Sequence, residues 1–158
     1  MALEVEHKFL VRDDGWRNAA DDGHFMRQGY LANVGVTSVR VRISGDDARL
    51  NIKHARSLTV RLEYEYSIPL EDARELLDAC GGPSVEKTRY RVPHAGHLWE
   101  VDVFAGDNEG LVMAEVELAG EGEHFERPPW LGEEVSQDPR YLNQNLAVNP
   151  FKQWAAEK

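Results

Sequence analysis

Apolar and polar residues alternate with a period of two along most of the chain, and this alternation is typical of β-strands. In the first segment, Leu3, Val5 and Phe9 alternate with charged residues. Turn-forming residues such as Ser44-Gly45-Asp46-Asp47 follow several segments, and short connections of this kind indicate antiparallel hairpins. The pattern predicts eight strands, near residues 3–9, 24–32, 39–43, 50–53, 62–68, 87–92, 99–103 and 114–118.

Two amphipathic helices are expected in addition to the strands. The first spans Pro69–Cys80, where Leu70, Ala73, Leu76 and Leu77 form an apolar stripe. The second begins at Asp138, an N-cap residue followed by Pro139. The segment 120–137 between the last strand and this helix is rich in Glu, Gly and Pro, so we expect an irregular surface connection there.

The polar faces of the strands carry charges of the same sign at positions i and i+2. Such residues lie on one face about 7 Å apart, and their repulsion costs about 2.4 kcal/mol at an effective dielectric of about 20. A face that is simply solvated, which is the alternative interpretation, has no reason to repeat this arrangement. The acidic pairs are Glu4/Glu6, Glu63/Glu65, Glu100/Asp102 and Glu115/Glu117, and the basic runs are Arg40/Arg42 and Lys87/Arg89/Arg91.

Each kind of cluster therefore suits a ligand of opposite charge. Pairs of carboxylates bind hard divalent cations such as Mg²⁺ or Mn²⁺, and runs of Arg and Lys bind phosphate. Eight strands can close into a barrel in which alternate side chains point inward. We expect a mainly β (α+β) fold, a closed eight-stranded antiparallel β-barrel with a charged lumen that holds a metal-bound polyphosphate. The two helices would cover its apolar outer face.

The bulk properties narrow the possible partners. A length of 158 residues predicts a single domain over 1–158, and a formal net charge of −10 argues against nucleic-acid binding. No stretch approaches the roughly 20 apolar residues of a membrane span, and the first residues lack the features of a signal peptide. The single cysteine, Cys80, permits no internal disulfide, so we expect a cytoplasmic protein. The oligomeric state is left open.

The segment Glu4-Val5-Glu6-His7-Lys8 resembles the E-x-E-x-K signature of the CYTH domain, or triphosphate tunnel metalloenzyme, superfamily. Further motifs resemble those of the family in the same order, over almost the whole chain. They are Gln28-Gly29-Tyr30-Leu31, Arg40-Val41-Arg42, Lys53, Glu63-x-Glu65, Lys87-x-Arg89-x-Arg91, Glu100-x-Asp102, Glu115-x-Glu117 and Arg140-Tyr141-Leu142-Asn143. The resemblance implies an eight-stranded tunnel that binds triphosphate with a divalent metal, most like the bacterial inorganic triphosphatase branch.

The resemblance also implies roles for the acidic residues. Glu4, Glu6 and Glu117 are the expected metal ligands, and Glu115 and Asp102 are the second choices. Glu63, Glu65 and Glu100 form a further set. We expect this set to bind a second metal, to orient the attacking water, or only to order the neighbouring arginines.

The basic residues are expected to hold the phosphates. The alternative is that they form cross-strand salt bridges to the neighbouring acidic pairs, and both can hold, since such pairs would orient the basic groups. This group comprises Arg40, Arg42, Lys53, Lys87, Arg89 and Arg91. Three basic residues on the strand face 87–91 are too many for simple pairing. Lys8, Tyr30 and Lys87 are the candidate catalytic residues. Lys8 and Tyr30 resemble the lysine–tyrosine pair that thiamine triphosphatases use near the leaving group. A lysine in a basic lumen is expected to have a lowered pKa and to exchange protons with a phenol. The alternative is that Tyr30 is an ordinary aromatic residue at the rim.

The expected function is metal-dependent hydrolysis of inorganic triphosphate to pyrophosphate and phosphate, with Mg²⁺ or Mn²⁺ as cofactor and the small triphosphate as the partner. The nearest alternatives use the same tunnel for another reaction, as class IV adenylate cyclases and thiamine or nucleoside triphosphatases do. A more distant alternative is a polyphosphate-binding module without catalysis. That alternative does not explain so many carboxylates, since binding an anion does not require them.

Overall fold

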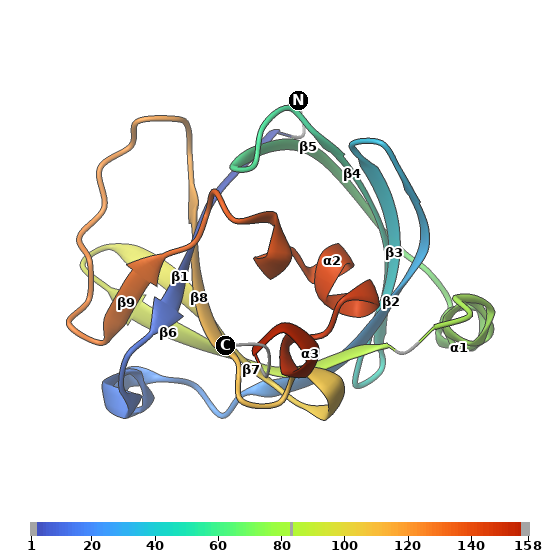
Figure 1. Ribbon diagram of the computed structural model, residues 1–158, viewed down its shortest axis with the longest axis horizontal. Helices are drawn as coiled ribbons and strands as arrows, with labels where there is room; N and C mark the ends of the chain where they lie inside the picture. Colours follow the sequence, from blue (N-terminus) through green and yellow to red (C-terminus); the bar gives the residue numbers. More distant parts are fainter. Residues whose placement is uncertain (1–2, 83, 156–158) are drawn as a thin grey trace.

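The computed structural model describes residues 3–82 and 84–155. Its main element is an antiparallel sheet of nine strands, eight of which close into a ring (Figure 1). Around the ring the order is β5-β4-β3-β2-β6-β7-β8-β1, and β1 pairs with β5 to close it. The ring strands are β1 (Leu3–Val11), β2 (His24–Val34), β3 (Thr37–Ser44), β4 (Asp47–Ala55), β5 (Val60–Ser67), β6 (Val85–His94), β7 (His97–Phe104) and β8 (Val112–Leu118). The predicted fold is confirmed.

Successive side chains of a strand point to opposite faces of the sheet. When the sheet closes into a ring, one set therefore faces the lumen and the other faces the outside. Along β8, Glu115 and Glu117 line the lumen, whereas Ala114 and Val116 belong to an apolar cluster on the outside. The same alternation holds on the other strands of the ring. The charged faces therefore meet one another across the lumen, as the sequence pattern predicts.

The outer cluster packs beneath the 3-10 helix η1 (Asp14–Ala19) and the segment that leads to a ninth strand, β9 (Leu131–Glu134). Aromatic rings dominate it, and Trp99 meets Trp130 edge-on at 5.8 Å between ring centroids. β9 pairs with the second half of β1, at Phe9↔Glu134 and Val11↔Leu131. The expectation of a mostly irregular segment 120–137 therefore missed this strand. The first half of β1 pairs with β5, and its second half continues beyond that pairing and accepts β9.

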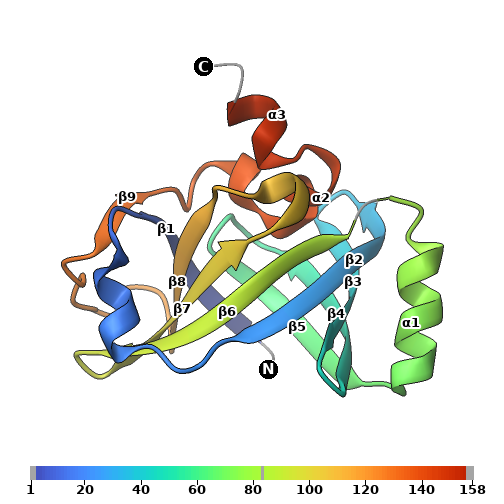
Figure 2. The same cartoon turned by 90° about the horizontal axis from the view of Figure 1, so that it is seen from below.

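Helix α1 (Leu70–Ala79) lies outside the ring, against β2, β3 and β4 (Figure 2). Ala73 and Leu77 pack on Val41 of β3, as the apolar stripe predicts. The close approach requires a glycine at position 29, because a Cβ atom there would lie 2.8 Å from Cys80 Sγ. The first predicted helix thus covers the outer face of the sheet.

The second predicted helix is split, and it does not cover the outer face. Asp138 caps only a short 3-10 turn, η3 (Pro139–Tyr141), after which come α2 (Asn143–Val148) and α3 (Phe151–Ala155). Both helices lie at one end of the ring, and α2 projects within its outline (Figures 1 and 2). There Leu146 and Trp154 pack with Met113 of β8 and with Phe104, which precedes the short helix η2 (Gly106–Asn108). One end of the tunnel is therefore filled with apolar side chains.

Within residues 3–82 and 84–155, no helix has both the length and the apolar character needed to cross a membrane.

Candidate active site

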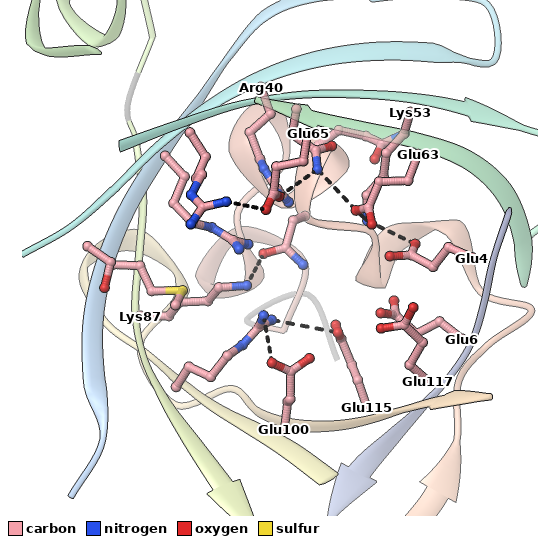
Figure 3. Close-up of a pocket in the computed structure, with 18 of the residues that line it drawn as sticks. Glu4, Glu6, Arg40, Lys53, Glu63, Glu65, Lys87, Glu100, Glu115 and Glu117 are labelled. Carbon is pink, nitrogen blue, oxygen red and sulfur yellow. Dashed lines mark hydrogen bonds and ion pairs between the residues drawn. The ribbon is translucent and has the colours of Figure 1, made fainter. Parts of the chain in front are cut away.

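The ring encloses a cavity of about 450 Å³ with a dense charge lining (Figure 3). Nine basic side chains and eight carboxylates line it, so a chain of net charge −10 surrounds a lumen that is nearly neutral overall. With the exception of Asp102, every residue predicted for the site lines this cavity. The structure therefore brings together groups that lie on eight strands.

One wall of the cavity is acidic. Glu4 and Glu6 come from β1 and Glu117 from β8, and Glu6 lies directly opposite Glu117 in the strand register (Figure 3). Lys53 contacts Glu4 at 3.0 Å and Lys8 contacts Glu6 at 3.3 Å, whereas Glu117 has no ion pair in the described part of the chain. Partial burial and the carboxylates of Glu4 and Glu6 raise the pKa of Glu117 to about 7. This wall thus concentrates negative charge that a cation would neutralise.

The acidic wall fits a hard divalent cation by its chemistry, although its side chains are not arranged around one. In the described residues no group of three or more Asp, Glu, His or Cys side chains is already in position to hold a metal ion. Burial and Glu115 raise the pKa of Glu6 as well, so two neighbouring carboxylates, Glu6 and Glu117, resist ionisation together. Carboxylate oxygens are the ligands that Mg²⁺ and Mn²⁺ prefer, and a bound cation would relieve this repulsion.

The basic wall contains two arginines, Arg40 and Arg42 on β3, whose guanidinium groups have few partners. Arg40 is 7 % exposed, its Nε has no hydrogen-bond partner, and its ion pair with Glu65 is long, at 3.9 Å. Arg42 Nε donates to Gln28 Oε1 at 2.8 Å, and no carboxylate forms an ion pair with it among the described residues. Burial and the charges of Arg40 and Arg89 lower the pKa of Arg42. These groups are suited to receive an anion.

Arg89 on β6 is, by contrast, fully paired. Its Nε and Nη2 bind the two oxygens of Asp102 at 2.8 and 2.9 Å, Nη1 contacts Glu100 at 3.2 Å, and Nη2 lies 3.7 Å from Glu115. Burial alone would raise the pKa of Asp102, but Arg89 and Lys87 lower it to about 2. Asp102 is 0 % exposed and lies behind the cavity wall, so the structure does not place this expected metal ligand within reach of an ion.

The lysine–tyrosine pair expected from the resemblance does not form in this structure. Lys8 Nζ donates to Glu115 Oε1 at 2.8 Å, and the described contacts include no bond between Lys8 and Tyr30. Burial would lower the pKa of Lys8, yet Glu115 and Glu6 raise it to about 12. The expectation of a lowered pKa for Lys8 is therefore wrong, because its nearest neighbours are carboxylates rather than the basic groups across the lumen.

Lys87 is the lysine whose pKa is lowered. It is almost completely buried, and burial outweighs the 2.8 Å contact with Asp102 and lowers its pKa to about 7, with a further contribution from Arg89 and Arg42. Its Nζ also donates to Asn143 Oδ1 at 2.9 Å. Near neutral pH this side chain can therefore exchange a proton.

Glu63 and Glu65 contact basic and amide groups. Asn51 Nδ2 donates to Glu63 Oε2 and to Glu65 Oε2, both at 3.0 Å. Lys53 lies 3.5 Å from Glu63. At the rim, Arg91 has a half-exposed side chain that lies 3.9 Å from Asp21.

Comparison with known proteins places these features in a family. The model of the CYTH domain matches residues 2–147 of the chain. This chain belongs to the CYTH domain family. It is 47 % identical over 153 residues to an inorganic triphosphatase of Acetivibrio thermocellus, a match that covers 96 % of this chain and 97 % of the relative. It is 40 % identical over 153 residues to an inorganic triphosphatase of Nitrosomonas europaea, over 92 % of this chain and 97 % of the relative. The family expected from the motifs is thereby confirmed.

Solved structures agree with this assignment. The crystal structure of the inorganic triphosphatase NE1496 matches with a TM-score of 0.67 and 38 % identity, over 94 % of this chain and 96 % of that one. HpAC1 from Hippeastrum, described as a candidate adenylyl cyclase with a dominant triphosphatase activity, matches with a TM-score of 0.58 over 74 % of this chain and 80 % of that one. At 16 % identity, the second likeness shows the CYTH fold alone.

Some lining residues of the CYTH tunnel were missed from the sequence. Arg61 is buried and lines the cavity, and its place two positions before Glu63 on the same strand face was a usable signal. The same holds for Arg49 and Asn51, which precede Lys53 at intervals of two. Asn143 and Gln144 also line the cavity, but they lie on α2, and no strand pattern indicates that this helix enters the tunnel. That placement depends on tertiary structure.

We expect Glu117→Gln to stabilise the metal-free protein at pH 8 and to have a much smaller effect at pH 5. The pKa of Glu117 is about 7 in the folded chain against an ordinary 4.5, so the folded state binds this proton more tightly than the unfolded state. The carboxylate therefore costs stability as the pH rises from about 4.5 to about 7. Because Glu117 is only partly buried and water screens its charge, the gain should be about 1 kcal/mol.

Urea denaturation in EDTA at both pH values measures this effect. The control is Glu75→Gln on the exposed outer helix, which should change stability equally at the two pH values. A gain from Glu117→Gln that is the same at pH 5 and pH 8 would contradict the assigned repulsion.

Proposed function

We propose that this chain hydrolyses inorganic triphosphate to pyrophosphate and orthophosphate with a divalent cation. The observation that carries the proposal is one cavity in which sparsely paired arginines face a wall of mutually repelling carboxylates. That combination suits an anion and a cation bound together. The family membership supports it further, because two relatives that match over nearly their whole length are named inorganic triphosphatases.

Glu4, Glu6 and Glu117 would hold the cation, which we propose to be Mg²⁺ or Mn²⁺. Such an ion supplies neutralisation of the phosphoryl oxygens and activation of water. Glu115 is the remaining carboxylate at this wall, but Lys8 and Arg89 lower its pKa well below the usual range despite its burial. We therefore assign Glu115 to holding these two basic groups in place.

The basic residues would act on the substrate directly. Hydrolysis of a phosphoric anhydride passes through a loose transition state in which negative charge spreads over the phosphoryl oxygens. Arg40 and Arg42, which line the cavity and have few partners there, are placed to bind those oxygens and to stabilise the charge as it develops. Lys87, whose pKa is about 7, is suited to give a proton to the departing pyrophosphate. Lys8 would remain charged and act only by electrostatic attraction.

The alternatives in the same tunnel require recognition of an organic group. Among the described residues that line the cavity, Tyr30 and His24 are the only aromatic rings, and neither Trp nor Phe is present. A nucleoside or a thiamine moiety would therefore find little surface on which to stack. The lining instead suits a substrate that consists of phosphoryl groups.

A panel of substrates with Mg²⁺ or Mn²⁺ tests the proposal. We expect orthophosphate release from tripolyphosphate at least about 100-fold faster, in kcat/KM, than from ATP or thiamine triphosphate, a difference of about 2.7 kcal/mol in transition-state binding. Excess EDTA should abolish turnover. Formation of cyclic AMP from ATP as the main reaction, or full turnover in EDTA, would contradict the proposal.

We also propose that the chain forms a single domain that acts in the cytoplasm. The family match over residues 2–147 and the lone free Cys80 support this. The small triphosphate is the one binding partner that we propose for the site.

A further inference from the structure

A single side-chain oxygen from the C-terminal part of the chain accepts hydrogen bonds from a lysine and a glutamine of the tunnel. Asn143, the first residue of α2, is 8 % exposed and lines the cavity. Its Oδ1 accepts a hydrogen bond from Lys87 Nζ at 2.9 Å and another from Gln28 Nε2 at 3.1 Å. The donors belong to β6 and β2, so this one oxygen connects α2 to two strands of the ring.

The contacts continue from Gln28 to the basic wall. Gln28 is 0 % exposed, and its Oε1 accepts from Arg42 Nε at 2.8 Å. Because Gln28 donates through Nε2 to Asn143 and accepts through Oε1 from Arg42, the orientation of its amide group is determined at both ends. A displacement of Asn143 would therefore be transmitted to the Arg42 guanidinium group.

The other hydrogen bond accepted by Asn143 Oδ1 orients Lys87. An ammonium group has three N–H donors, and here Asn143 Oδ1 accepts from one of them at 2.9 Å while Asp102 Oδ2 forms an ion pair with the same Nζ at 2.8 Å. Lys87 lines the cavity, so its Nζ can still donate to a ligand there. Without Asn143 the Nζ atom would keep one anchor and could rotate about it.

We propose that Asn143 is a positioning residue for catalysis: it holds Lys87, and through Gln28 also Arg42, where the phosphoryl groups of the substrate must meet them. The inference rests on the proposed function but concerns a residue outside the strand motifs. It also gives α2 a role beyond closing one end of the tunnel. The helix completes the basic wall with one oxygen that accepts from both donors, in addition to the contacts of Lys87 with Asp102 and of Gln28 Nε2 with the Tyr30 hydroxyl on the ring strands.

Asn143→Leu is the most direct test, because leucine keeps the branching and the number of side-chain heavy atoms of asparagine but lacks the acceptor. We expect kcat for tripolyphosphate to fall about 100-fold, the loss that a displacement of about 1 Å can cause, while KM changes less than about fivefold. Asn143→Asp retains an oxygen for both donors but adds a negative charge. It should therefore recover most of kcat and raise KM. A purely structural role would not separate kcat from KM in this way.

Asn145→Leu is the matched control on the same helix. Asn145 Nδ2 donates to the backbone oxygen of Pro139 at 2.7 Å, and the residue does not line the cavity, so kcat should remain as in the wild type. Thermal melting verifies that each variant folds. Asn143→Ala removes the same oxygen with less bulk and provides the test if the leucine variant does not fold.

Wild-type kcat in folded Asn143→Leu or Asn143→Ala would overturn the inference. The inference would also fail if the Asn143 and Asn145 variants lost activity in parallel with a fall in their melting temperatures. The loss of activity would then come entirely from weaker docking of the helix. A wild-type protein that releases no phosphate from tripolyphosphate would instead refute the proposed function itself. The two failures are therefore distinguishable.

Discussion

Glu6→Gln should lower the rate of tripolyphosphate hydrolysis at least about 100-fold, since even the loss of a supporting group at a metal site typically costs 10–100-fold. The folded protein should be as stable as the wild type or more stable. The pKa of Glu6 is raised by burial and by Glu115, so its charge is unfavourable in the metal-free state. Lys8 retains its closer partner, Glu115 Oε1 at 2.8 Å.

The matched control is Glu115→Gln in the same wall. The pKa of Glu115 is held well below its usual range by Lys8 and Arg89, against the effect of burial, so its charge stabilises the folded chain. This variant should lose stability, whereas Glu6→Gln should not. Urea denaturation in EDTA measures the stability of each variant. Phosphate release measures the hydrolysis rate, and calorimetric titration with Mn²⁺ measures the affinity for the metal. Unfolding of Glu6→Gln at 25 °C would indicate that Glu6 is structural.

Arg89→Ala should destabilise the protein by about 3–5 kcal/mol, the usual cost of removing one partner of a buried ion pair. The variant would leave Asp102 with Lys87 alone, and it would deprive Glu100 and Glu115 of a cation. This outcome differs from what the sequence pattern suggests. The pattern predicts that three basic residues at 87–91 are too many for simple pairing, yet Arg89 alone contacts three carboxylates.

Arg40→Ala provides the contrast within the same tunnel. Arg40 has one long ion pair, and Glu65 keeps Asn51 and Arg49 as partners without it. We expect a clearly smaller loss of stability than for Arg89→Ala, because only one long ion pair is removed, together with a clear loss of calorimetric affinity for tripolyphosphate in EDTA. Equal destabilisation by Arg40→Ala and Arg89→Ala would show that both arginines are structural, and the assignment of Arg40 to phosphate would be withdrawn.

The sequence by itself determined the strands and the face that each presents to the lumen. Period-two alternation is a local property, so Leu3–Phe9 and the other segments could be recognised without any partner. The same-sign pairs, such as Glu4/Glu6 and Arg40/Arg42, indicated a lumen that needs ligands, and the ordered motifs indicated the CYTH family. Every strand of the ring and helix α1 followed from patterns of this kind.

Only the tertiary structure decided which charged group meets which. Lys8 lies opposite Glu115 because β1 pairs with β8, and Arg89 lies opposite Asp102 because β6 pairs with β7. These registers explain why the pKa of Lys8 rises while that of Lys87 falls, although both are buried lysines on strands. Electrostatic energies depend on distance and burial, and neither is a property of a residue and its neighbours in sequence.

The position of α2 was likewise decided by tertiary packing. Its sequence predicts an amphipathic helix, and an apolar stripe can pack equally well on the outside of a sheet or at the end of a ring. Leu146 packs with Met113 and Phe104 at one end of the lumen. This packing places Asn143, on the same helix, within hydrogen-bond distance of Lys87. Packing between segments far apart in the chain therefore completes a site whose charged residues the sequence had largely indicated.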